Sequence, residues 1–200
     1  TSTNINEWHA LLNSEIWHKQ EHRGIIPALR LSYNHLPPHL KQLFAYCSLF
    51  PKDYVFDKNK LVLLWMAEGF LSQSKGNKSM ELLGHEYFEE LKSRSFFQHS
   101  TDDELGYTMH DLINDLATSV AGEFSFRLDG EVDVSDMNET SDKFRHLSLV
   151  GQGSGSYRKF IELQRAKYLR TFLVMSDGWE DGSLDKVLLE LQVLRVLSVV

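Results

Sequence analysis

The feature that most constrains the fold of this chain is an apolar pattern that recurs every 25 residues in its last third. The spacing apolar-x-x-apolar-x-apolar occurs at Phe144-Leu147-Leu149, Leu169-Phe172-Val174 and Leu194-Leu197-Val199. A period of this length with one short strand per unit is typical of a leucine-rich-repeat solenoid, in which each unit buries its apolar side against its neighbours. We therefore expect residues 144–200 to form the first repeats of an α/β solenoid that belongs to a longer array.

A helical periodicity governs most of the chain before these repeats. Apolar residues fall at helical spacing in residues 5–16, 26–36, 40–47, 58–70, 83–91 and 110–123. Pro37-Pro38 is compatible with the first turn of a helix, and Asp57 is a candidate N-cap for the helix that follows it. Because the run from Leu61 to Ala67 is almost continuously apolar, we expect that helix to be central.

Two short segments with strand character interrupt the helices. Phe96–His99 and Tyr107–Met109 flank a turn-rich stretch and predict a small hairpin, and a helix follows. Helices, a hairpin and a further helix in one compact unit indicate a winged helix. From Asp129 to Asp142 the sequence is acidic and contains no Lys or Arg, which favours a solvated linker.

These patterns give a mainly α fold class with small β elements. We expect a partial helical bundle at residues 1–50, a winged-helix subdomain at 51–128, an acidic linker at 129–143 and the repeats at 144–200. The chain also lacks an initial Met, so we interpret it as a segment of a longer protein.

Composition excludes several classes of partner and location. The formal net charge of −7 offers no basic surface for nucleic acid or an anionic membrane. No apolar run is long enough to span a bilayer, and no signal peptide is visible. The single cysteine, Cys47, excludes an internal disulfide framework and is expected to be a buried structural thiol. We therefore predict a cytoplasmic location and a protein or small-molecule partner.

Four ordered motifs resemble the C-terminal half of the nucleotide-binding (NB-ARC) region of plant disease-resistance receptors of the coiled-coil, leucine-rich-repeat class. They are LRLSYNHLP at Leu29–Pro37, FAYCSLFPKDY at Phe44–Tyr54, WMAEGF at Trp65–Phe70 and MHDLINDLA at Met109–Ala117. The resemblance covers about Trp8 to Phe124, and the repeats follow where this family has its leucine-rich region. It implies a regulatory role in defence, with a winged helix between the end of a helical subdomain and the repeats.

The resemblance also implies a site at the Met109-His110-Asp111 motif, where the family's histidine contacts the β-phosphate of ADP. The chemistry is reasonable, because a helix N-terminus and an imidazole N–H both favour an anion. Asp111 is expected to bond backbone N–H groups and to hold the loop in shape, and Met109 is expected to point into the core. We predict His110 as the nucleotide-binding residue and the triplet as the regulatory motif.

The resemblance further implies that this segment is not itself an enzyme. We find no Gly-rich loop ending in Lys-Ser or Lys-Thr, so groups that complete an ADP or ATP site, or hydrolyse ATP, are expected upstream. The partners implied are the nucleotide, a pathogen effector or a guarded host protein bound by the repeats, and further copies of the receptor on activation. No metal or nucleic acid is expected.

The sequence gives weaker support to two other functions. A winged helix is often a DNA reader, but the helix from His110 to Glu123 contains acidic residues and no Lys or Arg, and the wing carries Asp102, Asp103 and Glu104. His18-Lys19-Gln20-Glu21-His22 has the H-x-x-E-H spacing of some zinc metallopeptidases, with Glu89 as a conceivable third ligand. A solvated segment between two helices explains that match better, and a repeat loop explains the glycines of residues 151–156 better than a phosphate cradle does.

Overall fold

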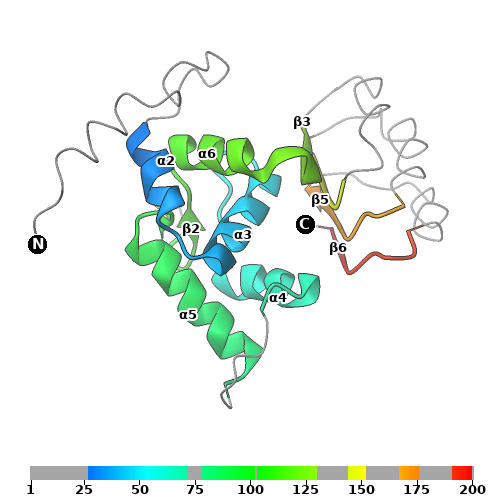
Figure 1. Ribbon diagram of the computed structural model, residues 1–200, viewed down its shortest axis with the longest axis horizontal. Helices are drawn as coiled ribbons and strands as arrows, with labels where there is room; N and C mark the ends of the chain where they lie inside the picture. Colours follow the sequence, from blue (N-terminus) through cyan, green and yellow to red (C-terminus); the bar gives the residue numbers. More distant parts are fainter. Residues whose placement is uncertain are drawn as a thin grey trace, which may run out of the picture.

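The structure is a computed structural model that describes residues 27–71, 78–101, 103–129, 144–151, 167–175 and 191–199. Its helices and strands are, in order, α2 (Pro27–Asn34), α3 (Pro38–Tyr46), the 3-10 helix η2 (Cys47–Leu49), α4 (Lys58–Glu68), α5 (Met80–Ser93), β1 (Gln98–His99), β2 (Tyr107–Thr108), α6 (Asp111–Ala121), the 3-10 helix η3 (Gly122–Phe124), β3 (Ser125–Asp129), β4 (His146–Val150), β5 (Thr171–Met175) and β6 (Val196–Val199). Figure 1 shows the helices gathered around the hairpin, with the remaining strands to one side. The predicted fold class is confirmed, whereas the helix expected at residues 5–16 lies outside the described residues.

The helix ends follow local sequence signals. Pro38 occupies the first turn of α3, as predicted, where its missing N–H is harmless. Asp57 caps α4, because its Oδ1 accepts from Asn59 N at 2.7 Å and from Lys60 N at 3.1 Å. The same helix ends two residues earlier than expected, since Gly69 adopts a left-handed conformation with φ of 79°.

The helices enclose an aromatic core. Its largest fully buried side chains include Trp65, Tyr46, Phe44, Phe88 and Phe96. We expected α4 to be a central helix, and it is buried on one side only, because Leu63 is 53% exposed while Trp65 on the opposite side is fully buried. One face of α4 packs on α5 and on the sheet, and the other meets solvent despite its apolar sequence.

The hairpin is shorter than the sequence indicates. β1 and β2 pair antiparallel with Gln98 opposite Thr108 and His99 opposite Tyr107. Phe96 and Phe97, expected at the start of the first strand, are instead both buried in the helical core. Ser95, with φ of 65°, turns the chain sharply after α5 and directs these rings inward.

The remaining strands form one parallel sheet in the order β3-β4-β5-β6. Leu147 lies opposite Phe172, and Phe172 opposite Leu197, so the register reproduces the 25-residue repeat. The sequence did not predict β3, which pairs along its whole length with β4 and places Leu128 beside Leu149. The parallel sheet therefore begins directly after α6 and η3, and Asp129, expected in the linker, is its last β3 residue.

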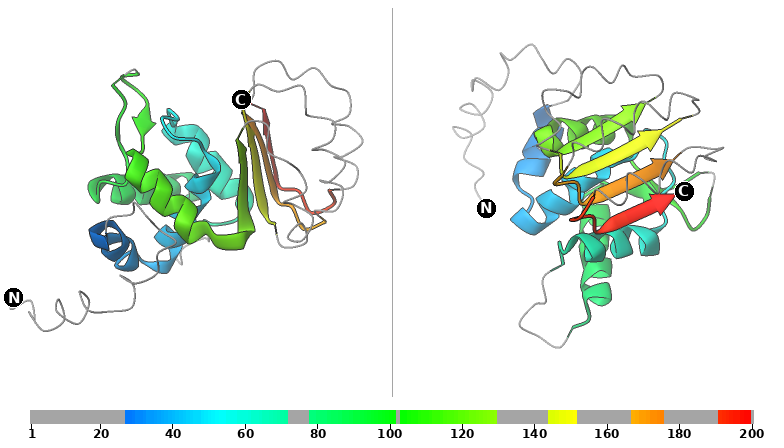
Figure 2. Two further views of the ribbon diagram at one scale, coloured as in Figure 1. Left: turned by 90° about the horizontal axis from the view of Figure 1, so that it is seen from above. Right: turned by 90° about the vertical axis from the view of Figure 1, so that its right-hand side faces the viewer.

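The two faces of the sheet have different neighbours, as the edge-on view in Figure 2 shows. Side chains on one face, such as Leu147 and Phe172, form a second apolar core with the other repeat residues. On the opposite face Leu173 and Val196 join the core of the helices. The winged-helix region and the first repeat strands thus pack directly against each other.

Candidate functional site

The Met109-His110-Asp111 triplet joins β2 to α6. Met109 is 4% exposed and belongs to the helical core, as its place at a strand end predicts. His110 and Asp111 are both exposed, and Asp111 is the first residue of the helix. Burial of the first residue therefore anchors the other two at the surface.

His110 is itself the N-cap of α6. Its backbone is non-helical, with φ of −59° and ψ of 145°, and its Nδ1 accepts from Leu112 N at 3.2 Å. Since Nδ1 acts as an acceptor, a neutral ring carries its proton on Nε2, which can donate to a ligand. The capping role expected of Asp111 belongs to His110, because the residue before the first helical turn is placed to reach the N–H two positions ahead.

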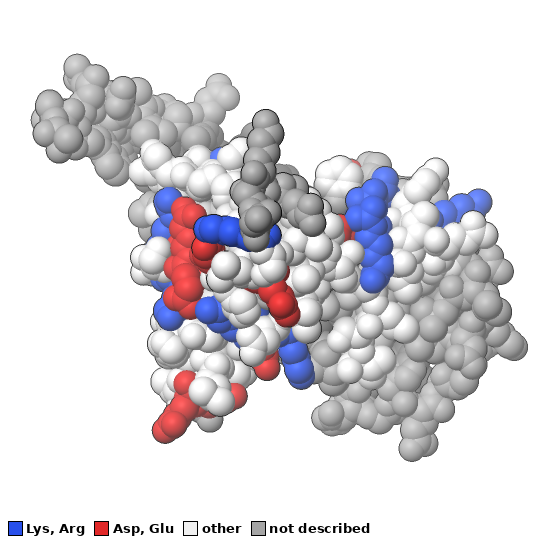
Figure 3. Space-filling model, turned by 90° about the horizontal axis from the view of Figure 1, so that it is seen from below, with Lys and Arg blue, Asp and Glu red and all other residues white. Residues whose placement is uncertain are grey.

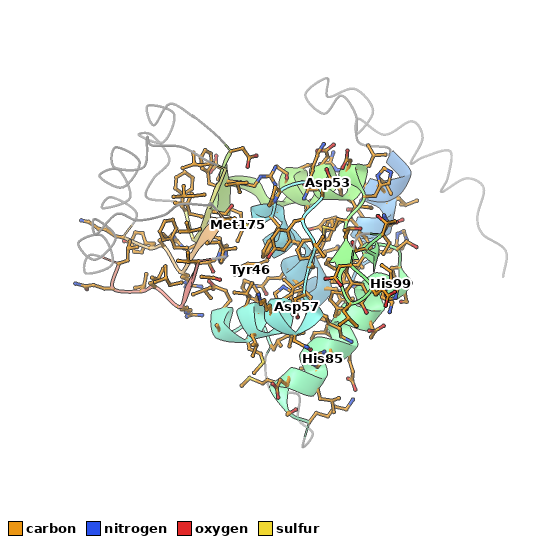
Figure 4. The ribbon with its side chains drawn as sticks, turned by 180° about the vertical axis from the view of Figure 1, so that it is seen from behind. Tyr46, Asp53, Asp57, His85, His99 and Met175 are labelled. Atoms are coloured by element: carbon orange, nitrogen blue, oxygen red, sulfur yellow. The ribbon has the colours of Figure 1, made fainter. Side chains whose placement is uncertain are left out.

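A cleft of about 260 Å³ opens beside this helix end. Its lining combines the triplet with residues of the hairpin and of the turn before α4, namely Gln98, His99, Thr101, Thr108 and Asp53. Figure 4 labels Asp53 and His99, which come from these two different segments. Asp53 has φ of 61°, a left-handed conformation that is uncommon for residues other than glycine. The cleft therefore depends on two segments that are distant in sequence, the turn at Asp53 and the stretch from Gln98 to Asp111.

The lining of this cleft combines carboxylates with groups that can donate a hydrogen bond to an anion. Asp53 and Asp111 contribute carboxylates, and no Lys or Arg is among its lining residues. The N-terminus of α6 and the Nε2–H of His110 offer donors to an anion. Nearby, Lys52 Nζ binds Asp115 Oδ1 at 2.8 Å, and this hydrogen bond raises the pKa of Lys52. The residues present fit a contact to part of a diphosphate, whereas neutralisation of the phosphates requires cations from another segment.

A second polar cluster lies between α4 and the parallel sheet. Glu68 is 1% exposed, and its Oε1 accepts a hydrogen bond from the Thr171 hydroxyl. His146 Nδ1 lies 3.4 Å from the same oxygen, and the Tyr46 hydroxyl lies 3.2 Å from Thr171 Oγ1. Figure 4 shows Tyr46 at this junction. Burial raises the pKa of Glu68, but His146, Thr171 and Arg195 outweigh it and hold that pKa below its ordinary value.

Sequence reasoning missed this cluster. The sequence identified Glu68 only as part of the WMAEGF motif and gave it no role. An acidic residue at the end of an apolar helical run is nevertheless a signal, because a charged side chain is rarely buried without a partner. The partners themselves, His146 and Thr171, are far along the chain. Their contact could be found only with the sheet in place.

The zinc alternative gains no support from the described residues. The H-x-x-E-H segment at residues 18–22 and the glycine-rich residues 152–156 lie outside them. Glu89 binds Lys58 at 2.7 Å and Lys92 at 3.1 Å, and mainly through the Lys58 hydrogen bond its pKa is lowered. Within the described ranges no group of three or more His, Cys, Asp or Glu side chains is placed to hold a metal ion.

Cys47 has the environment of a structural thiol. Its side chain is completely buried, and its Sγ–H donates to the carbonyl of Leu43 at 3.3 Å. Burial strongly raises the pKa of this thiol, so the nucleophilic thiolate is disfavoured. The prediction that Cys47 is buried is confirmed.

The surface charge argues against DNA reading. α6 carries Asp111 and Asp115 and has no basic residue in its last turn. On the side of the molecule away from α6, Figure 3 shows acidic and basic side chains next to one another on the described residues, rather than a continuous basic surface. Without Lys or Arg, α6 lacks the cations that neutralise a phosphate backbone.

The described part of the chain thus combines a helical core, a small hairpin and α6, the elements of a winged helix, with a parallel sheet in which β4, β5 and β6 follow a 25-residue period. Comparison with known families agrees. The profile of the family described as "Disease resistance protein Winged helix domain" matches residues 49–117, which include α4, α5, the hairpin and the His110 motif.

Curated relatives extend this match. "Putative disease resistance RPP13-like protein 1" of Arabidopsis thaliana is 42% identical over 202 residues, covering 97% of this chain and 18% of the relative. "Disease resistance protein RGA2" of Solanum bulbocastanum is 46% identical over 147 residues, covering 72% of this chain and 14% of the relative. "Disease resistance protein RPM1" of Arabidopsis thaliana is 32% identical over 155 residues, covering 72% of this chain and 17% of the relative. The chain belongs to the family of plant disease-resistance proteins and spans less than a fifth of the length of these relatives.

No helix in the described part of the chain is long and apolar enough to cross a membrane.

Proposed function

We propose that this chain is the regulatory segment of a cytoplasmic plant immune receptor, in which the winged helix contacts ADP and passes its state to a leucine-rich-repeat sensor. The segment acts as part of a switch between ADP and ATP states, and residues upstream complete the nucleotide site. Catalysis of ATP hydrolysis, where it occurs, depends on those upstream groups. The match to the winged-helix family and the disease-resistance relatives supports the receptor role.

One observation carries the nucleotide contact. His110 lines the cleft and uses Nδ1 to cap α6, which leaves Nε2–H as the donor of a neutral ring beside the helix N-terminus. The capping bond fixes the ring orientation, so Nε2 is a preorganised donor for a phosphate oxygen. The carboxylates of Asp53 and Asp111 make tight binding of ADP to this segment alone unfavourable. The winged helix therefore acts as a lid over a nucleotide held mainly by another domain.

The sheet supports a sensor role for the repeats. Its strands β3 to β6 lie against the helices on one face, so a movement of the repeats is transmitted to the winged helix. Further repeats offer a surface for a pathogen effector or a guarded host protein. Release of the lid is expected to open the receptor for assembly with further copies.

Two substitutions of His110 test the proposal in the longer receptor. His110→Asn keeps a good N-cap but lacks Nε2, whereas His110→Ala removes both groups. We expect both variants to lose copurified ADP, because the Nε2 contact favours the closed state. Wild-type ADP retention in His110→Asn would overturn the proposed contact. Asp57→Asn, at the cap of α4, is the matched control and should retain ADP fully.

A further inference from the structure

Asn114 connects the first turn of α6, which begins at His110, to the segment that follows η2. It is 1% exposed and lies one helical turn after His110, to whose carbonyl its backbone N–H donates at 3.0 Å. Its side-chain Nδ2 donates to the carbonyl of Phe50 at 3.0 Å. The start of α6 is thereby fastened to the chain just after η2.

Arg127 of β3 reaches the same carbonyl from the parallel sheet. Its Nη1 donates to Phe50 O at 2.7 Å and to Ser48 O at 2.9 Å, and lies 3.4 Å from Asn114 Oδ1. Its Nε pairs with Asp129 at 2.9 Å, which holds the planar guanidinium in this orientation. The Phe50 carbonyl is thus shared by a side chain from α6 and a side chain from the sheet.

Movement of the sheet must act on this junction. β3 pairs with β4 from Ser125 opposite His146 to Asp129 opposite Val150, so Arg127 moves with the repeat strands. A shift of β3 by more than about 0.5 Å away from the carbonyls of Phe50 and Ser48 would lengthen both hydrogen bonds of Arg127 beyond the normal range of about 2.7 to 3.2 Å. Phe50 O and Asn114 would then lose their shared partner.

We propose that Asn114 and Arg127 are positioning residues that couple the first repeat strand to His110. While β3 is docked, they hold the first turn of α6 in the geometry that presents Nε2 to the cleft. Displacement of the repeats loosens that turn and weakens the nucleotide contact. The inference deepens the proposed function and rests on it, because the regulated group is the His110 imidazole.

The coupling can be measured first in this chain without nucleotide. Arg127→Met removes the donors and keeps the length of the side chain, whereas Arg127→Lys keeps a cation that can reach one carbonyl. Arg170→Met is the matched control, since the Arg170 guanidinium makes no hydrogen bond among the described residues.

We expect the Leu112 amide, which bonds to His110 Nδ1, to exchange with solvent about fivefold faster or more in Arg127→Met. Arg127→Lys should restore part of the protection of the Leu112 amide. If Arg127→Met fails to fold, the comparison between Arg127→Lys and wild type still tests the coupling. Wild-type exchange in both Arg127 variants would overturn it.

Release of ADP from the longer receptor then separates this inference from the proposed function. We expect Arg127→Met to accelerate ADP release, and to add nothing further when His110 is already Asn. Full additivity of the two substitutions would show that Arg127 does not act through His110 and would overturn the coupling. If His110→Asn alone leaves ADP release unchanged, the proposed contact fails, and a faster Leu112 exchange in Arg127→Met still supports the mechanical link.

Discussion

Two polar clusters that each contain a histidine and a carboxylate differ in their access to water. His110 and Asp111 are exposed beside a cleft, whereas the side chain of His146 is 13% exposed and Glu68 only 1%. In the first cluster the Nε2 of His110 has no hydrogen-bond partner within the part of the chain that the structure describes, so it can donate to a ligand. In the second, Thr171 and the other partners of Glu68 belong to the protein itself. Burial thus separates a cluster suited to binding from one suited to holding two parts of the fold together.

The contrast has an energetic basis. A polar group that stays hydrated loses little when its partner is removed, whereas a buried charge without partners is costly. Substitutions at Glu68 should therefore act on stability and those at His110 on the nucleotide. The largest effect on the free energy of unfolding is expected at Glu68 and the smallest at His110.

Glu68→Ala should lower the free energy of unfolding by about 3 kcal/mol, because the buried polar partners of the carboxylate lose their interaction with it. Glu68→Gln keeps an oxygen that can accept from Thr171 and should lose less. Urea denaturation of the three proteins measures both values. Equal stability of Glu68→Ala and wild type would mean that the cluster does not hold the sheet to α4.

Acid should remove the contribution of the Glu68 charge. Its pKa is lowered in the folded state, so ionised Glu68 stabilises the fold above the ordinary carboxyl pKa of 4.5, and this stabilisation disappears as the pH falls through the lower folded value. The difference in unfolding free energy between wild type and Glu68→Gln should therefore shrink from pH 7 to pH 3. A difference that stays constant over this range would exclude an ionised Glu68.

Asp57→Ala should cost about 1 kcal/mol, since α4 loses the cap that its Oδ1 provides to two backbone N–H groups. Asp57→Ser, which retains a capping oxygen, should recover most of the loss in thermal or urea unfolding. Because Asp57 does not line the cleft, ADP retention in the longer receptor should not change. A loss of ADP in Asp57→Ala would show that stability alone controls retention.

His110→Ala should have the smallest effect on stability, about 0.5 kcal/mol, because an exposed cap is replaced in part by water. His110→Asn should unfold like wild type in the same urea series. A cost above that of Glu68→Ala would reverse the contrast between the two clusters. It would make His110 a structural residue rather than a ligand-binding one.

Much of the fold could be predicted because it depends on local signals. The repeat of Leu147, Phe172 and Leu197 predicted the sheet register, and Asp57 predicted a helix start. β3 was missed because it stands outside the 25-residue period, although Phe126 and Leu128 face the same core as their β4 partners. Its place depends on strand pairing, which no short window of sequence contains.

The site was predicted less completely than the fold. Met109, His110 and Asp111 could be singled out as a motif, yet the choice of His110 over Asp111 as the cap depends on the backbone angles of the junction. The cleft needed Asp53 and His99 brought to the same helix end. The partners of Glu68 required the sheet, because they come from strands more than seventy residues later in the chain.

An experimental structure of the longer receptor with bound ADP tests the central claim most directly. The distance between His110 Nε2 and the nearest β-phosphate oxygen is the decisive quantity. We predict about 2.7 to 3.2 Å, with Nδ1 still accepting from Leu112 N. An ADP-bound structure in which His110 Nε2 instead bonds to protein, with no phosphate oxygen within reach, would contradict the account.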